Sequence, residues 1–171
     1  MDSLAIAIPI IKKSEGLRLK AYPDPATGGK PFTIGYGATY YENGAPIQPG
    51  DKITQAQADK LLLFHAGKAR EAVRKLVTAK INPNQEAALI SLAFNIGEGN
   101  LAKSTLIKKI NANPGDAAIN NEFNKWVYAN KKIFPGLVKR RQEEVNLYFK
   151  PVVFAGALIA AAGLLLFYLL K

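Results

Sequence analysis

Apolar residues recur at helical spacing through the central part of the chain. Between residues 54 and 79 they return every three or four positions, at Ala58, Leu61, Leu62, Ala69, Val73, Leu76 and Val77. This spacing places them on one face of a helix. Thr54 and Gln57 have the spacing of a capping box, in which two side chains satisfy free backbone groups at a helix start. The pattern predicts a long amphipathic helix that follows Thr54 and ends near Ala79.

Capping residues and apolar runs predict five other helices. Ser3 is the expected N-cap of the first, which contains Pro9. The second is nearly apolar all round, which is typical of a buried helix. It starts with Asn82 as cap and a Pro at the first helical position, and Gln85 is expected to reach back to the cap as in a capping box. The five are expected over residues 3–13, from Asn82 to Phe94, from Ser104 to about Asn111, through Phe123 and Trp126, and over residues 137–149.

The segment before the long helix has a period of two. Apolar and charged side chains alternate from Leu17 to Ala21, a pattern typical of a strand. Turn-forming Pro and Gly residues follow, and a second apolar run starts at Phe32. We predict paired strands over residues 17–22 and 31–36, with a third short strand near 45–48. The fold class is therefore α+β, mainly α, with one small β region.

The composition changes after Lys150. From Val152 to Leu170 nineteen consecutive residues are uncharged, enough to cross about 30 Å of hydrocarbon as a helix. Lys150 and Lys171 flank this run, and Tyr168 lies where an interfacial aromatic is expected. A single transmembrane helix is the favoured interpretation, and a buried core helix is the alternative.

Two domains follow from this change: a globular domain over residues 1–150 and a membrane anchor over 151–171. The expected location is a virion membrane or a host inner membrane, with one C-terminal span. Small residues at Gly156, Ala160 and Gly163 would allow the span to self-associate.

The net charge and the absence of Cys limit the kinds of partner and ligand that are expected. The chain has 23 Lys and Arg against 13 Asp and Glu, a net charge of +10, which attracts polyanions such as wall polymers and anionic lipid headgroups. The basic residues are scattered along the sequence, so no dedicated nucleic-acid site is expected. There is no Cys, and His65 is the one His, which leaves no ligand set for a metal. No cofactor is predicted.

The stretch from Ser14 to Thr39 carries the candidate chemistry. Glu15 precedes the predicted hairpin, Asp24 lies at its bend and Thr33 lies on its return strand. Two carboxylates in different environments are the minimum equipment for cleaving a glycosidic bond.

The pattern resembles the phage-type lysozymes, the muramidases of glycoside hydrolase family 24. The residues that carry the resemblance are Glu15-Gly16, Leu19, Ala21-Tyr22, Asp24 and Thr33-Ile34-Gly35-Tyr36-Gly37. It continues to about residue 149 through Ile53–Ala58, Ser91–Gly97, Ser104–Leu106, Trp126, Pro135–Leu137, Arg140 and Arg141. It implies a lysozyme-like fold of two lobes, a small β-hairpin lobe and a helical lobe.

The resemblance also implies roles for the site residues. Glu15 is expected to be the general acid, and Asp24 with Thr33 is expected to hold the attacking water of an inverting reaction. An acid that acts at neutral pH needs a pKa raised by burial, and the apolar helix before Glu15 makes its partial burial plausible. Arg140 or Arg141 is expected nearby, where a positive charge has the opposite effect. The candidate substrate-binding residues are Asn95, Ser104, Arg140 and Arg141.

Two positions depart from the family pattern. Ala38 stands where the family commonly has His after the Gly-Tyr-Gly turn, and we expect the change to cost a structural contact rather than the reaction. The segment from Asp24 to Thr33 is long for the family, which leaves the position of the water open.

The expected function is that of a membrane-anchored muramidase that cuts the β-1,4 bond between N-acetylmuramic acid and N-acetylglucosamine. It would act in wall lysis when a phage enters or leaves its host. The alternative is a non-catalytic, wall-binding structural module of a lipid-containing virion. The presence of Glu15, Asp24 and Thr33 together favours the enzyme. A third possibility, a tail that permeabilises membranes, rests on the apolar run only.

Overall fold

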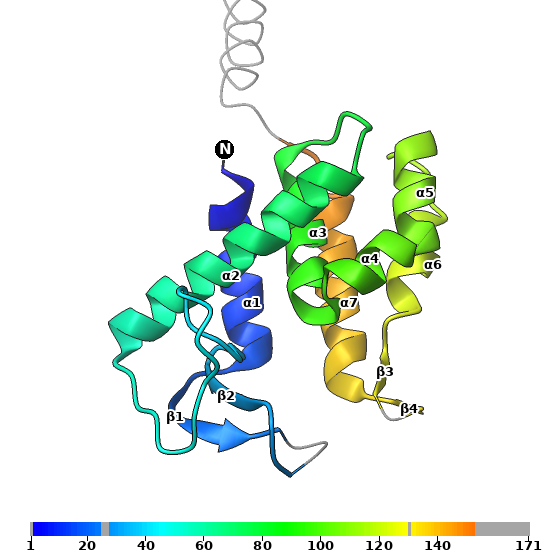
Figure 1. Ribbon diagram of the computed structural model, residues 1–171. Helices are drawn as coiled ribbons and strands as arrows, with labels where there is room; N and C mark the ends of the chain where they lie inside the picture. The colour runs from blue at the N-terminus through cyan, green and yellow to red at the C-terminus, as the bar shows by residue number, and fades with distance from the viewer. Residues whose placement is uncertain (1, 25–27, 130, 153–171) are drawn as a thin grey trace, which may run out of the picture.

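The computed structural model describes residues 2–24, 28–129 and 131–152. Figure 1 shows a small β region beside a larger group of helices, with α2 running from one to the other. This arrangement confirms the predicted α+β class with mainly helical content. In chain order the elements are α1 (Ser3–Glu15), β1 (Arg18–Pro23), β2 (Phe32–Gly35), α2 (Gln55–Leu76), α3 (Pro83–Ile96), α4 (Glu98–Lys103), α5 (Thr105–Ala112), α6 (Ile119–Asn124), β3 (Tyr128–Ala129), β4 (Lys132–Ile133) and α7 (Pro135–Tyr148).

Helix α3 is the centre of the helical part. It packs against α1, α2 and α7, and Figure 1 shows it surrounded by other helices. Because neighbours cover it on several sides, its middle turns are buried, including Ala88, Leu89, Ile90 and Leu92. Asn82 and Gln85 form the predicted capping box at its start. The expectation of a buried, capped helix is confirmed.

The N-cap of helix α1 lies one residue earlier than predicted. The N-cap is Asp2, whose carboxylate accepts from the Leu4 amide at 3.1 Å, while Ser3 is buried as the first helical residue. Pro9 is on the exposed side, and the helix continues past it because Ala7 and Ile11 are fully buried in the core. The helix therefore reaches Glu15, two residues beyond the expected end.

The β region is a two-stranded hairpin. Strands β1 and β2 pair antiparallel, with Tyr22 opposite Thr33 and Pro23 opposite Phe32. The third strand predicted near residues 45–48 is wrong, because that segment makes one isolated bridge between Pro46 and Tyr40. Proline has no amide hydrogen to donate, which prevents a regular ladder there.

Helix α2 joins the two parts of the molecule. Its Leu61 packs with Ile34, Ala38 and Ile47 of the β region, whereas Ala66, Ala69 and Val73 belong to the helical core. The capping box of Thr54 and Gln57 is confirmed. The helix ends at Leu76 rather than near Ala79.

A side chain from α5 accounts for this early end of α2. Asn111 donates to the Leu76 carbonyl at 3.0 Å and accepts from the Thr78 amide at 2.8 Å. These hydrogen bonds replace those that another helical turn would make.

Other differences lie between residues 97 and 137. Helix α4 and the β3–β4 hairpin were not predicted, and Trp126 follows α6 instead of lying in a helix. Helix α7 starts at Pro135, two residues before the predicted start, because proline is well suited to a first helical turn.

Along the described ranges, no helix is long and apolar enough to cross a membrane. The predicted span from Val152 to Leu170 lies outside the described residues, apart from Val152 itself.

Candidate active site

Glu15 lies where the helical part meets the β region. It is the last residue of α1, and its side chain is 22% exposed. Gly37, in the turn after β2, has a φ of 90° and lies so close that a Cβ there would be 3.3 Å from Glu15 Oε2. The structure therefore brings together the two ends of the motif, Glu15-Gly16 and Gly35-Tyr36-Gly37.

Arg140 of α7 holds the other oxygen of this carboxylate. Its Nη1 is 2.5 Å from Glu15 Oε1, and the arginine side chain is only 4% exposed. The expectation that Arg140 or Arg141 would lie near Glu15 is confirmed for Arg140, which makes the direct contact. One oxygen of the Glu15 carboxylate thus pairs with Arg140, and the other faces Gly37.

The interior side of Arg140 leads into a buried polar network. The Ser91 carbonyl of α3 accepts a hydrogen bond from Arg140 Nη2 at 3.0 Å. Glu144 accepts Arg140 Nε at 3.2 Å, Arg141 Nη2 at 3.0 Å and the Ser91 hydroxyl at 2.7 Å. Burial raises the pKa of the Glu144 carboxyl, against the opposite effect of the two arginines.

Sequence reasoning missed Ser91 and Glu144 as parts of the site. Both left a signal: Ser91 is a hydroxyl in a nearly apolar helix, and Glu144 follows Arg140 and Arg141 at the spacing of one helical turn. Neither pattern alone says that the two residues meet, because Ser91 is on α3 and Glu144 is on α7.

Asp24 and Thr33 lie at the bend end of the β1–β2 hairpin. Asp24 directly follows β1, and its amide donates to the Gly29 carbonyl at 3.0 Å. Thr33 lies on β2 opposite Tyr22. Both residues are half-buried. The last pair of the ladder is Pro23 with Phe32, so Asp24 lies one step beyond that pair and Thr33 one step before it. Part of the bend, residues 25–27, lies outside the described chain.

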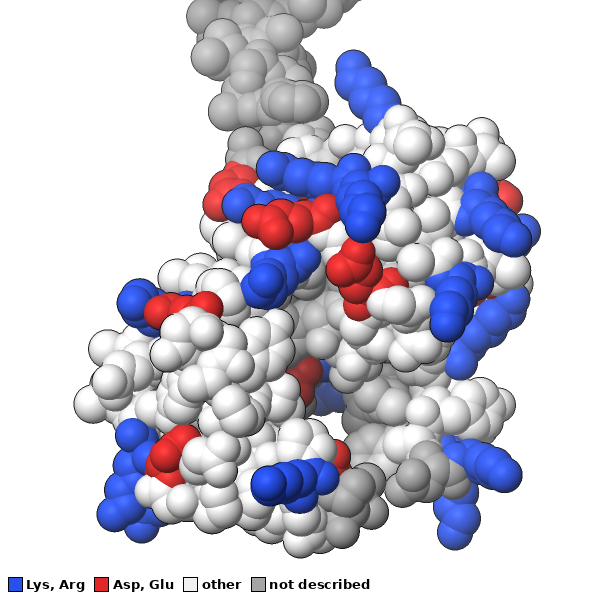
Figure 2. Space-filling view, viewed as in Figure 1, with Lys and Arg blue, Asp and Glu red and all other residues white. Residues whose placement is uncertain are grey.

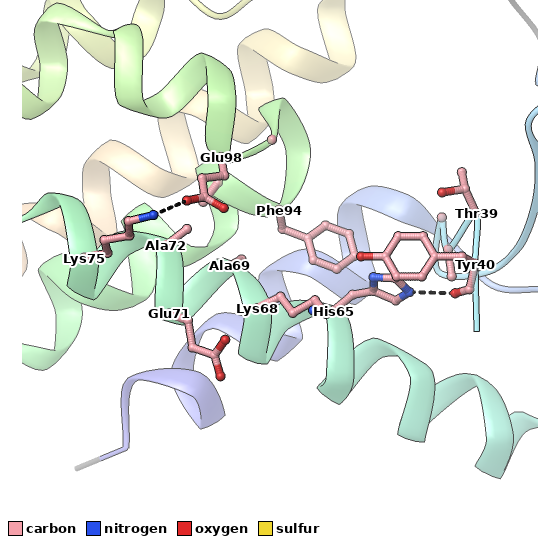
Figure 3. A pocket seen from close by; sticks show the side chains of 14 residues that line it. Thr39, Tyr40, His65, Lys68, Ala69, Glu71, Ala72, Lys75, Phe94 and Glu98 are labelled. Atoms are coloured by element: carbon pink, nitrogen blue, oxygen red, sulfur yellow. Dashed lines mark hydrogen bonds and ion pairs between the residues drawn. The ribbon is translucent and has the colours of Figure 1, made fainter. Parts of the chain in front are cut away.

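A pocket of about 670 Å³ starts at the turn that touches Glu15. Figure 3 shows Thr39 and Tyr40 at one end of it, residues of α2 along it, Phe94 between the ends, and Glu98 with Lys75 at the other end. His65 Nε2 lies 3.0 Å from the Tyr40 carbonyl, and its ring contacts the rings of Tyr40 and Phe64. Burial lowers the pKa of His65. The histidine is half-buried and joins α2 to the β region, as a structural residue would.

The remaining candidates have other surroundings. Asn95 is half-buried and lines a second pocket, of about 450 Å³, together with Trp126 and Tyr128. Ser104 is buried as the predicted N-cap of α5, donating to the Leu101 carbonyl at 2.6 Å. Arg141 is fully buried and contacts Glu144 and the Trp126 carbonyl.

The charged residues of this face do not form one patch. Figure 2 shows basic side chains spread around the edge of the molecule, with acidic ones among them. It also shows a hollow between the two parts, with acidic and basic side chains recessed in it. Among the residues that the structure describes, no three His, Asp or Glu side chains group as metal ligands would.

Known proteins share both the sequence pattern and the fold. The family described as phage lysozyme matches residues 12–144. An endolysin of Bacillus phage B103 is 40% identical over 86% of this chain and 54% of its own length. An endolysin of Acyrthosiphon pisum secondary endosymbiont phage 1 is 39% identical over 81% of this chain and 92% of its own. The chain thus spans about half the length of the first relative and nearly all of the second.

A solved structure agrees with these matches. The endolysin from Escherichia coli O157:H7 phage FAHEc1 superposes with a TM-score of 0.75 and 34% identity, covering 86% of this chain and 93% of that one. The family match covers Glu15, the hairpin, the long helix and the terminal helix that carries Arg140. The chain belongs to the phage lysozyme family.

Proposed function

We propose that this protein is a muramidase that hydrolyses the β-1,4 bond between N-acetylmuramic acid and N-acetylglucosamine in peptidoglycan. The observation that carries the proposal is the placement of Glu15. Its carboxyl group lies between the two parts of the molecule, held by Arg140 and faced by Gly37. A carboxyl fixed in this way is suited to donate a proton to a glycosidic oxygen that enters the hollow.

The reaction needs a second group for the attacking water. Asp24 and Thr33 lie near each other in the hairpin register, and a carboxylate with a hydroxyl is suited to hold and activate one water. Glu15 protonates the leaving oxygen as the glycosidic C–O bond breaks. Water held by Asp24 and Thr33 attacks the opposite face of the sugar and gives a proton to the Asp24 carboxylate. The product then has inverted anomeric configuration, and we expect the two carboxyl groups to lie about 6.5–9.5 Å apart, as such a reaction requires.

The biological setting follows from the relatives and the tail. The relatives above are named endolysins, which favours wall lysis over the non-catalytic wall-binding module. We propose that residues 152–170 anchor the enzyme in a virion or host membrane, since this run is uncharged and flanked by Lys150 and Lys171. Small residues in the run would allow self-association there.

Glu15→Gln tests the assignment. The amide keeps the shape of the side chain but has no proton to donate to the leaving oxygen, so wall lysis should fall by more than about a hundredfold. The assay is release of reducing ends from purified walls, with NMR of the fresh product to identify its anomer. The near-ultraviolet circular dichroism of the variant should match that of the parent.

Two results would contradict the proposal. Near-parental lysis by Glu15→Gln would remove Glu15 as the acid. A product of retained configuration would remove the water-holding role of Asp24 and Thr33.

A further inference from the structure

Glu144 is a fully buried carboxylate that the proposed reaction does not use directly. It lies on α7, one turn beyond Arg140 and Arg141, and its side chain has no exposed surface. It therefore cannot touch a substrate. A buried charge is costly unless it is paired and hydrogen-bonded, so its contacts should show what it does.

The contacts of Glu144 converge on Arg140. Glu144 Oε1 accepts from Arg140 Nε at 3.2 Å and from the Ser91 hydroxyl at 2.7 Å. The Ser91 carbonyl takes Arg140 Nη2 at 3.0 Å. Since guanidinium is planar and rigid, fixing Nε and Nη2 also fixes Nη1. That third nitrogen is the one that contacts Glu15.

Charge balance supports the same assignment. Arg141 is fully buried, and its Nε lies 2.8 Å from Glu144 Oε2, while Arg140 lies between Glu144 and Glu15. The four groups carry two positive and two negative charges when ionised. Glu144 is thus shared between the arginines, and Arg140 keeps one side for Glu15.

We propose that Glu144 and Ser91 are positioning residues for the proton donor. They hold the guanidinium of Arg140, and Arg140 holds the carboxyl of Glu15 against the glycosidic oxygen. The inference rests on the proposed role of Glu15. Its physical basis is that a displacement of about 1 Å in a reacting group costs up to about a hundredfold in rate.

The competing explanation is that the network only stabilises the fold. Glu122 offers a matched control, because it is also a buried carboxylate in an ion pair, 2.7 Å from Lys125 Nζ, and it accepts a hydrogen bond from Thr105. It lies on α6, and none of these contacts reaches Glu15. Glu122→Gln therefore measures the loss of a buried carboxylate without a change at the donor.

The experiment compares kcat and KM of the full chain and of Glu144→Gln, Ser91→Ala and Glu122→Gln across pH. Solubilised peptidoglycan fragments are the substrate, at a temperature where each variant is folded. Glu144→Gln should lower kcat by about tenfold to a hundredfold with little change in KM. Its pH profile should also differ from the parental one, because the replacement removes a negative charge beside Arg140, the residue that contacts Glu15.

Ser91→Ala keeps every charge and removes the hydroxyl that contacts Glu144 and Arg140, so kcat should fall less, by about threefold to tenfold. Glu122→Gln should keep the parental kcat and pH profile. Parental values in folded Glu144→Gln would overturn the proposal. If Glu144→Gln does not fold, parental values in Ser91→Ala overturn it in the same way.

An equal loss in Glu122→Gln would also overturn the proposal, because the effect would then be general destabilisation. Glu15→Gln is measured in parallel. If Glu15→Gln is active, the proposed function fails. If Glu15→Gln is inactive while Glu144→Gln is parental, only the positioning inference fails.

Discussion

At the scale of single residues, the candidate site depends on side chains that contact partners far away in sequence. Glu15 and Arg140 are 125 positions apart, yet they form a direct ion pair. Gly37 contributes by having no side chain, since a Cβ would crowd the Glu15 carboxylate. His65 shows the same principle at the edge of the large pocket, where its ring bonds to the Tyr40 carbonyl, 25 positions away. Residues of this kind tie the β region to the helices.

His65 should make the stability of the protein depend on pH. Burial lowers the pKa of His65, so protonation favours the unfolded chain. Its stabilising effect is complete above the ordinary histidine pKa of about 6.5, and it is lost as pH falls through the lowered value. Urea unfolding of the parent at pH 7.5 and pH 5.0 should show this loss.

His65→Gln is the control, since glutamine keeps a donor for the Tyr40 carbonyl and does not titrate. As His65 is the one histidine in the sequence, the variant should lose less stability than the parent between the two pH values. Equal losses in both proteins would show that His65 is not the titrating group.

At the scale of elements, the sequence predicts what local rules govern. The capping boxes at Thr54 and Asn82, the buried α3 and the β1–β2 hairpin follow from short patterns, and all are present. The failures come from tertiary contacts, which local patterns do not contain. Asn111 ends α2 early, and the buried Ser91 and Glu144 meet across two helices.

Asn111 should contribute more to the free energy of unfolding than its position in a short helix suggests. Replacing it with Ala removes the hydrogen bonds to Leu76, Thr78 and Ala79. Since some of these backbone groups would be left without partners, the free energy of unfolding should fall by about 1–3 kcal/mol. Urea denaturation measures the change.

Asn146→Ala provides the comparison. Asn146 is exposed on α7 and accepts one side-chain bond, from Gln142, so its replacement should change stability by less than about 0.5 kcal/mol. If the two variants are equally stable, Asn111 does not determine the end of α2.

At the scale of the whole molecule, the helical part is built around α3. The end of α7 packs against this helix and is hydrogen-bonded to its start. The Lys150 carbonyl accepts from the Asn84 side chain at 3.0 Å, which ties the end of α7 to the start of α3. The contacts between the start of α3 and the end of the helical part therefore extend to Lys150, where the proposed globular domain ends. The net charge is +10, and the basic side chains on the face seen in Figure 2 are scattered, which suits loose attraction to anionic wall polymers better than a single docking site.

Cutting the chain after Lys150 tests the proposed division into domains 1–150 and 151–171. The new carboxylate would remain near Asn84 at the start of α3, where a negative charge is favourable. The shortened protein should fold, hydrolyse isolated walls and no longer sediment with membranes. The full chain, assayed beside it, should sediment with membranes at high salt.

An unfolded truncation product would show that residues after 150 belong to the core. A shortened protein that still sediments with membranes at high salt would show a second anchor. Either result would contradict the proposed single span.

Under the proposed role of Glu15, its pairing with Arg140 also determines when wall-cutting activity can arise during synthesis. A ribosome makes α1 first and α7 last among the described helices, so a growing chain carries the acid long before it carries the arginine that holds it. Ser91 is likewise made before Glu144, the carboxylate to which its hydroxyl donates. An incomplete translation product would therefore lack an assembled proton donor, and wall-cutting activity would arise only once α7 has been released and has docked.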